Sequence, residues 1–79
     1  MKLIKNIEVD NVNYSVVKFK HEDKVFFGTV DFKYIKNNKL TQNLNGLQML
    51  VANTEEQAIQ KRKQHVENVK LMQQLLGNR

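Results

Sequence analysis

The sequence of 79 residues contains no cysteine, no proline and no tryptophan, and only three glycines. Without cysteine the chain has neither a disulfide framework nor a thiolate metal site. The absence of proline and the scarcity of glycine separate it from linkers and disordered segments, and 41% hydrophobic residues can support a core. A chain this short buries only about 60% of its unfolded surface, which predicts a single small domain of modest stability.

Long apolar runs are also missing. No run reaches the length of a membrane span, and the segment Met1–Lys5 turns polar too early for a secretion signal. We therefore expect a cytoplasmic protein without a membrane partner. The chain has 13 Lys and Arg against 8 Asp and Glu, a formal net charge of +5. This balance favours anionic partners, but solubility or an AT-rich coding sequence explains it equally well.

Alternating polar and apolar residues predict β-strands before residue 53. We expect strands at about residues 2–9, 13–20, 24–35 and 47–52, with a further short strand within 39–44. Asp10-Asn11 and Asn45-Gly46 have the chemistry of tight turns, and residues 21–24 form a polar four-residue loop. In the third strand the even positions are apolar, so this row is expected to face the core, and Thr29 lies on the opposite face. Gly28 marks a candidate β-bulge.

Residues Thr54–Leu76 contain no glycine or proline and predict one long amphipathic helix that ends at Gly77. Thr54 is the expected N-cap, and Gln57 three residues later completes a capping box. One side of the helix is apolar and is expected to cover the sheet along its length, with Ala58, Ile59, Val66, Val69, Met72 and Leu76.

The order of elements is β-β-β-(β)-β-α. It predicts an α+β fold, in which an antiparallel sheet of three to five strands carries one long C-terminal helix packed on one face. The other sheet face is expected to be free for function. No internal repeat or domain boundary is visible, so we expect residues 1–79 to form a single domain.

Residues with catalytic potential are few. The chain has two histidines, His21 and His65, and one serine, Ser15, without a catalytic motif, a phosphate loop or a metal-ligand cluster. We therefore expect no enzyme, no cofactor and no metal. Arg62 and His65 interrupt the apolar side of the helix. We expect the stem of Arg62 to cover the sheet edge while its guanidinium reaches water or a carboxylate, and His65 to be half-buried.

The candidate nucleic-acid-binding residues are seven lysines and a threonine: Lys18, Lys20, Lys24, Thr29, Lys33, Lys36, Lys61 and Lys63. A sheet face carrying the first six could follow a phosphate backbone, but lysines also protect strand edges in a solvated face. For Lys61 and Lys63, a solvated helix flank is the ordinary interpretation. Leu71 and Leu75 lie one turn apart, away from the apolar side of the helix. They indicate either a partner contact or fraying of the last turn.

The pattern Tyr14-x-Val16-x-x-Phe19-Lys20, followed by Lys24, Gly28-Thr29-Val30 and Thr54-x-Glu56-x-Ala58, resembles the AP2-like, arm-type DNA-binding domains of phage and transposon integrases. The resemblance implies a three-stranded sheet docked in a DNA groove, with Lys18, Lys20, Thr29 and Lys33 facing the DNA. The chain departs from the family in its additional N-terminal strand, in the segment 36–53, and in having few arginines, the residues that commonly read guanine.

Two functions follow as hypotheses. The first is a small, non-catalytic phage or mobile-element accessory protein that binds nucleic acid, DNA by preference, through a lysine-bearing sheet face. The second is a protein-interaction module that binds or inhibits a host protein such as a CRISPR effector, through the open sheet face or through Leu71 and Leu75. A homodimer is compatible with both, because a small core and an apolar helix end gain from a second copy.

Overall fold

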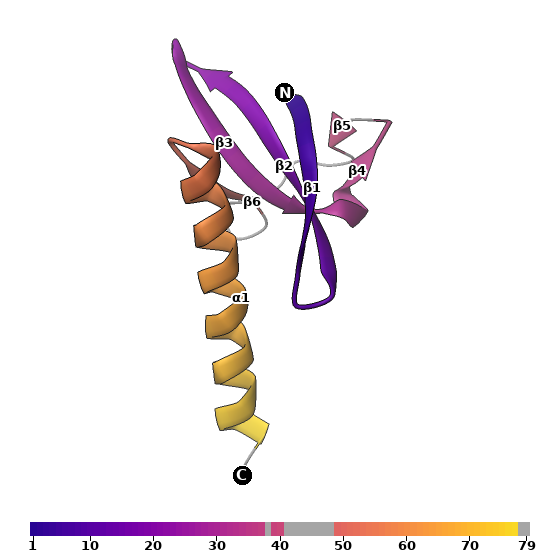
Figure 1. The fold of residues 1–79 in the computed structure, drawn as a ribbon, viewed down its shortest axis with the longest axis vertical. Coiled ribbons are helices and arrows are strands. Elements are labelled where there is room, and N and C mark those ends of the chain that lie inside the picture. Colours follow the sequence, from indigo (N-terminus) through magenta and orange to yellow (C-terminus); the bar gives the residue numbers. More distant parts are fainter. Residues whose placement is uncertain (38, 41–48, 78–79) are drawn as a thin grey trace.

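The computed structural model describes residues 1–37, 39–40 and 49–77. Its elements are β1 (Lys2–Val9), β2 (Val12–His21), β3 (Lys24–Asp31), the 3-10 helix η1 (Phe32–Tyr34), β4 (Ile35–Lys36), β5 (Lys39–Leu40), β6 (Met49–Ala52) and α1 (Glu55–Gly77). Strands β1, β2, β3 and β6 form an antiparallel sheet in that order, and β4 and β5 form a second, two-stranded sheet. The long helix packs against the larger sheet (Figure 1), so the predicted α+β fold is confirmed. The predicted Asn45-Gly46 turn lies outside the described residues.

Two tight hairpins join the first three strands. The φ angles of their loop residues are all positive: 52° for Asp10, 67° for Asn11, 51° for Glu22 and 64° for Asp23. Two consecutive left-handed residues are typical of type I′ turns, whose twist matches that of the flanking strands. Because His21 pairs directly with Lys24, the second loop has two residues, and the predicted loop of four is too long.

The bulge of the sheet lies in β1. The pairing of β1 with β2 shifts between Leu3 and Lys5, which leaves Ile4 as the extra residue. The bulge predicted at Gly28 is wrong, because the pairing of β2 with β3 continues unbroken through this residue. A Cβ atom on Gly28 would lie 3.2 Å from Cγ of Met49, so this glycine makes room for a side chain of β6.

Strand β3 ends at Asp31, and the prediction that it continues to residue 35 is wrong. The carboxylate of Asp31 accepts a hydrogen bond of 3.0 Å from the backbone N–H of Lys33. This local bond stabilises the turn of η1 instead of a continued strand. Phe32 is 46% exposed, so it does not extend the apolar row of β3 into the core.

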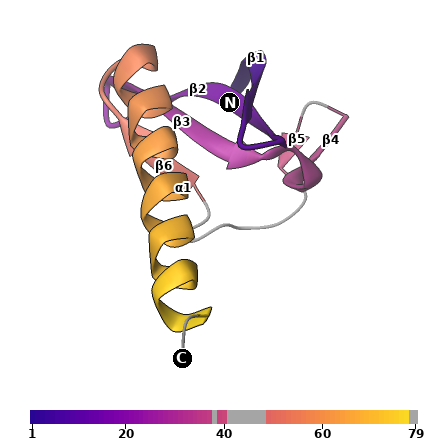
Figure 2. The same ribbon diagram turned by 60° about the horizontal axis from the view of Figure 1, so that its bottom comes forward.

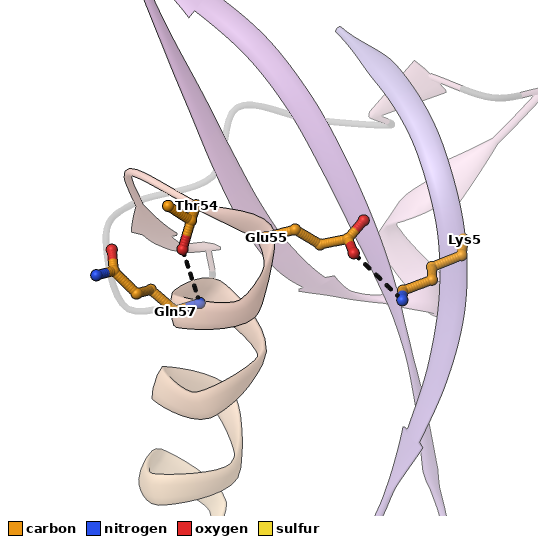
Figure 3. A network of polar contacts seen from close by, with 4 residues as sticks. All are labelled: Lys5, Thr54, Glu55 and Gln57. Atoms are coloured by element: carbon orange, nitrogen blue, oxygen red, sulfur yellow. Dashed lines mark hydrogen bonds and ion pairs between the residues drawn. The ribbon is translucent and has the colours of Figure 1, made fainter.

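The helix begins as predicted. Oγ1 of Thr54 accepts a hydrogen bond of 3.1 Å from the backbone N–H of Gln57 (Figure 3), which identifies Thr54 as the N-cap. Glu55 in the first turn lies 3.3 Å from Nζ of Lys5 in β1. This ion pair reaches from the start of the helix to the strand at the far edge of the sheet, across β2 and β3.

Both faces of the sheet are covered at its centre. The helix lies on the face of Val16 and Thr29, which are fully buried. The opposite face contains Ser15, Val17 and Val30, which are fully buried as well. The even positions of β3 therefore face away from the helix, and the expectation of one free sheet face is wrong for the central part of the sheet.

Only the first half of α1 packs on the sheet. Ala58 is fully buried and Val66 half-buried, and Lys70 still reaches Asp10 of the first hairpin at 3.8 Å. Beyond Lys70 the helix projects past the sheet (Figures 1 and 2). The predicted apolar side accordingly becomes exposed towards the C-terminus: Val69 is 38%, Met72 61% and Leu76 60% exposed. The expectation that this side covers the sheet as far as Leu76 is wrong.

The left-handed geometry of the first hairpin predicts a contrast between two substitutions of Asn11. Asn11→Val should destabilise the fold by about 1–2 kcal/mol, because a β-branched side chain strains this conformation. Asn11→Gly should change the free energy of unfolding by less than about 1 kcal/mol, because glycine adopts this left-handed conformation without steric strain. Urea unfolding followed by circular dichroism measures both. Asn13→Val, in the adjacent strand, is the control and should change little. Equal losses of unfolding free energy in Asn11→Val and Asn11→Gly would contradict the assigned turn.

Candidate nucleic-acid interface

Three lysines gather at the end of the sheet beside the β2–β3 hairpin. The strand pairing places Lys2 directly opposite Lys18, and Lys20 follows two residues later on the same face. All three side chains are exposed. We call Lys2, Lys18 and Lys20 the hairpin lysine cluster. Lys18 and Lys20 were predicted as binding residues, whereas Lys2 was not.

The bulge in β1 explains why Lys2 joins the cluster. In a hairpin with a two-residue loop, Val9 pairs with Val12 and Lys5 with Val16. Continued without a shift, this register would place Lys2 opposite Phe19, on the other face of the sheet. The extra residue in β1 moves Lys2 into register with Lys18 and onto its face.

Aromatic rings accompany the lysines on both faces of this hairpin. Nζ of Lys18 lies 5.9 Å from the ring centroid of Phe27. On the opposite face the rings of Phe19 and Phe26 stack with centroids 5.9 Å apart, and Lys24 lies on that face as well. Both stacked rings are half-buried. Aromatic rings beside cationic side chains can stack on exposed bases while the lysines contact phosphates.

Acidic residues neutralise the cluster only weakly. Nζ of Lys20 lies 4.0 Å from Oδ1 of Asp23, and both side chains are largely exposed, so water and salt screen this pair. A shallow hollow of about 350 Å³ accompanies the cluster and is lined by Met1, Lys2, Lys18, Phe19, Lys20 and Val25. The lining contains no acidic residue, so the hollow suits an anionic group.

The other predicted lysines belong to different parts of the fold. Lys33 lies in η1 with Nζ 5.2 Å from the Tyr34 ring centroid, and Lys36 lies in β4. Nζ of Lys61 donates a 2.7 Å hydrogen bond to the backbone carbonyl of Val51. This bond ties the helix to the edge strand β6. Lys63 is exposed on α1. Lys33 and Lys36 lie outside the four-stranded sheet, so they do not belong to the lysine-bearing sheet face that the sequence predicted, whereas Lys61 and Lys63 lie on the helix as expected.

Thr29 was expected to face nucleic acid, and this prediction is wrong. Its side chain is fully buried beneath α1. Its Oγ1 accepts a hydrogen bond of 2.9 Å from Nε of Arg62, and its backbone carbonyl accepts one of 2.6 Å from Nη2. Thr29 therefore holds the helix to the sheet and cannot reach a ligand at the surface.

Arg62 is the charged residue of the core. It is 4% exposed, and its guanidinium lies 4.7 Å from the ring centroid of Tyr14. Burial lowers the pKa of Arg62, while the nearby Tyr14 and Asp31 oppose this shift. The group stays protonated at any physiological pH. Of the two outcomes expected for its head, burial excludes water, while the carboxylate of Asp31 lies near enough to oppose the lowering of the pKa. His65 is half-buried as expected.

The end of α1 carries the two leucines that were predicted as partner-binding residues. Leu71 and Leu75 are 49% and 74% exposed, so both are accessible to a partner. In the part of the chain that the structure describes, no three His, Cys, Asp or Glu side chains are placed to hold a metal ion. Within the same residues, no helix combines the length and apolarity needed to cross a membrane.

Comparison of the chain with protein-family models, with curated proteins and with solved structures found no match. The resemblance to AP2-like domains, and the origin in a phage or mobile element that it implies, therefore stay predictions.

The buried contact between Arg62 and Thr29 predicts strong coupling between these two residues. Arg62→Met should cost about 2–3 kcal/mol of unfolding free energy, and Thr29→Val about 1–3 kcal/mol, because each leaves a buried polar partner unsatisfied. The double variant should lose less than the sum by about 1–2 kcal/mol. Urea unfolding of the four proteins measures this cycle. Lys63→Met, on the exposed flank, is the control and should change stability by less than about 0.5 kcal/mol. Strict additivity would refute the coupling.

Proposed function

We propose that the protein is a small, non-catalytic accessory protein that binds nucleic acid through the hairpin lysine cluster. The observation that supports this most strongly is the placement of Lys2 directly opposite Lys18, with Lys20 beside them. Like charges opposite each other on neighbouring strands destabilise a sheet. A polyanion bound at this end of the molecule would relieve that repulsion, so the cluster is better suited to the bound state than to the free protein.

The chemistry of the cluster indicates binding without sequence preference. Lysine contacts phosphate as a point charge, and phosphate contacts carry no sequence information. Bidentate readout of guanine is typical of arginine, and the one described arginine, Arg62, is buried in the core. The half-buried Phe19 and Phe26 offer additional stacking for unpaired bases. We therefore propose a phosphate-directed interaction, with duplex DNA as the first ligand to test.

Removal of the cluster should weaken binding and reduce its dependence on salt. The triple variant Lys2→Gln, Lys18→Gln, Lys20→Gln lowers the net charge from +5 to +2. Each lost phosphate contact should reduce the magnitude of the slope of log K against log salt by about 1. The slope of the triple variant should therefore be smaller in magnitude than that of the wild type by about 3. Fluorescence anisotropy with labelled duplex and single-stranded DNA at 50–200 mM salt, the range over which such contacts are resolved, measures this slope.

The matched control removes the same charge from the helix. Lys61→Gln, Lys63→Gln, Lys70→Gln also leaves a net charge of +2 and should retain most of the affinity and slope. Equal losses in the two triple variants would show that net charge, not the cluster, governs binding. Absence of binding by the wild type at low salt would remove the proposed function.

A further inference from the structure

The end of α1 presents an apolar surface outside the core. It begins at Val69, next to Lys70, whose Nζ makes the ion pair with Asp10, and it extends to Leu76. This last part of α1 projects past the sheet (Figure 2). The surface consists of five side chains with their exposed fractions: Val69 38%, Leu71 49%, Met72 61%, Leu75 74% and Leu76 60%. Leu75 is three residues from Met72 and four from Leu71, so Leu71 and Leu75 lie beside the predicted apolar side and not away from it. The five side chains therefore form a contiguous patch, which we call the helix-end patch. Monomeric proteins seldom leave such a patch in water.

The charge distribution favours a second copy of this chain as the occupant. Residues 71–77 contain no charged side chain, although 27% of the whole chain is charged. Two identical surfaces carry the same charges, so self-association of a basic protein requires a neutral contact region. The helix-end patch meets this requirement, because its five side chains are apolar and the neighbouring Gln73 and Gln74 are uncharged.

The exposed surface area of the chain also favours a second copy as the occupant of the helix-end patch. A folded monomer of 9.3 kDa is expected to expose about 5,000 Å². The chain exposes 5987 Å², an excess of about 1,000 Å² over that expectation. Each partner of a stable complex of standard size buries about 800 Å². The projecting end of α1 contributes to this excess, since its apolar side chains are exposed, and a dimer contact there would reduce the exposed surface of each copy.

We propose that the protein forms a homodimer in which the helix-end patches of two copies pack against each other. The contact is isologous, since each copy contributes the same residues. It leaves both hairpin lysine clusters free at the far ends of the two molecules. The dimer does not depend on the proposed nucleic-acid binding, because the two surfaces share no residue.

Sedimentation equilibrium of the full chain at about 100 μM, a concentration at which an interface of standard size is populated, tests the dimer. The wild type should have twice the chain mass of 9.3 kDa. Met72→Glu and Leu75→Glu should each reduce the mass to that of one chain, because a buried unpaired carboxylate disfavours the contact. The matched control is Val25→Glu. Val25 is 44% exposed near the lysine cluster, and this variant should remain a dimer.

Cross-linking locates the contact, because the native chain has no cysteine. Oxidised Leu75→Cys should give a disulfide-linked dimer, while Val25→Cys should remain monomeric under denaturing, non-reducing conditions. Circular dichroism of each variant verifies that α1 is retained. A wild-type monomer at every concentration overturns the proposal. A dimer that survives both glutamate substitutions, or that cross-links through residue 25, also overturns it.

Discussion

The contact between Arg62 and Thr29 determines how the helix sits on the sheet. A buried guanidinium must use its fixed, planar set of donors, because an unpaired charge in the core is far more costly than one in water. Its Nε and Nη2 both donate to Thr29. Sliding the helix along its axis by one turn would break both bonds at once. This single residue therefore selects the sheet face and the axial position of α1, and it thereby also sets how far the helix end projects.

The same contact has a consequence for the sheet. With α1 fixed over Thr29, and with Val17 and Val30 buried on the opposite face, the centre of the sheet offers no surface to a ligand. The exposed side chains that we propose as binding residues therefore lie at the two ends of the molecule. One end carries the hairpin lysine cluster and the other the helix-end patch. The elongated outline of the chain, 47 × 24 × 20 Å, reflects this arrangement.

Local patterns in the sequence predict the local structure well and the long-range arrangement poorly. The Asp10-Asn11 turn, the N-cap at Thr54 and the α+β class depend on neighbouring residues, and the structure confirms them. The second hairpin lies where it was predicted, but its loop has two residues instead of four. The face covered by the helix depends on a partner 33 residues away from Arg62, which no local pattern reveals. Because β2 and β3 are buried on both faces, their alternation does not identify the side that receives the helix. The only local sign of the bulge that brings Lys2 to Lys18 is the interrupted alternation at Ile4.

The separation of the two surfaces allows them to act independently. The hairpin lysine cluster and the helix-end patch lie at opposite ends of a molecule 47 Å long (Figure 1). At physiological ionic strength, electrostatic interactions between exposed charges are largely screened beyond about 8 Å. The lysines therefore do not oppose a contact between two neutral helix ends, nor does that contact cover the lysines. If both proposals hold, a dimer joined in this way would present two basic ends to one polyanion, and the second contact would gain from the high effective concentration that the first creates.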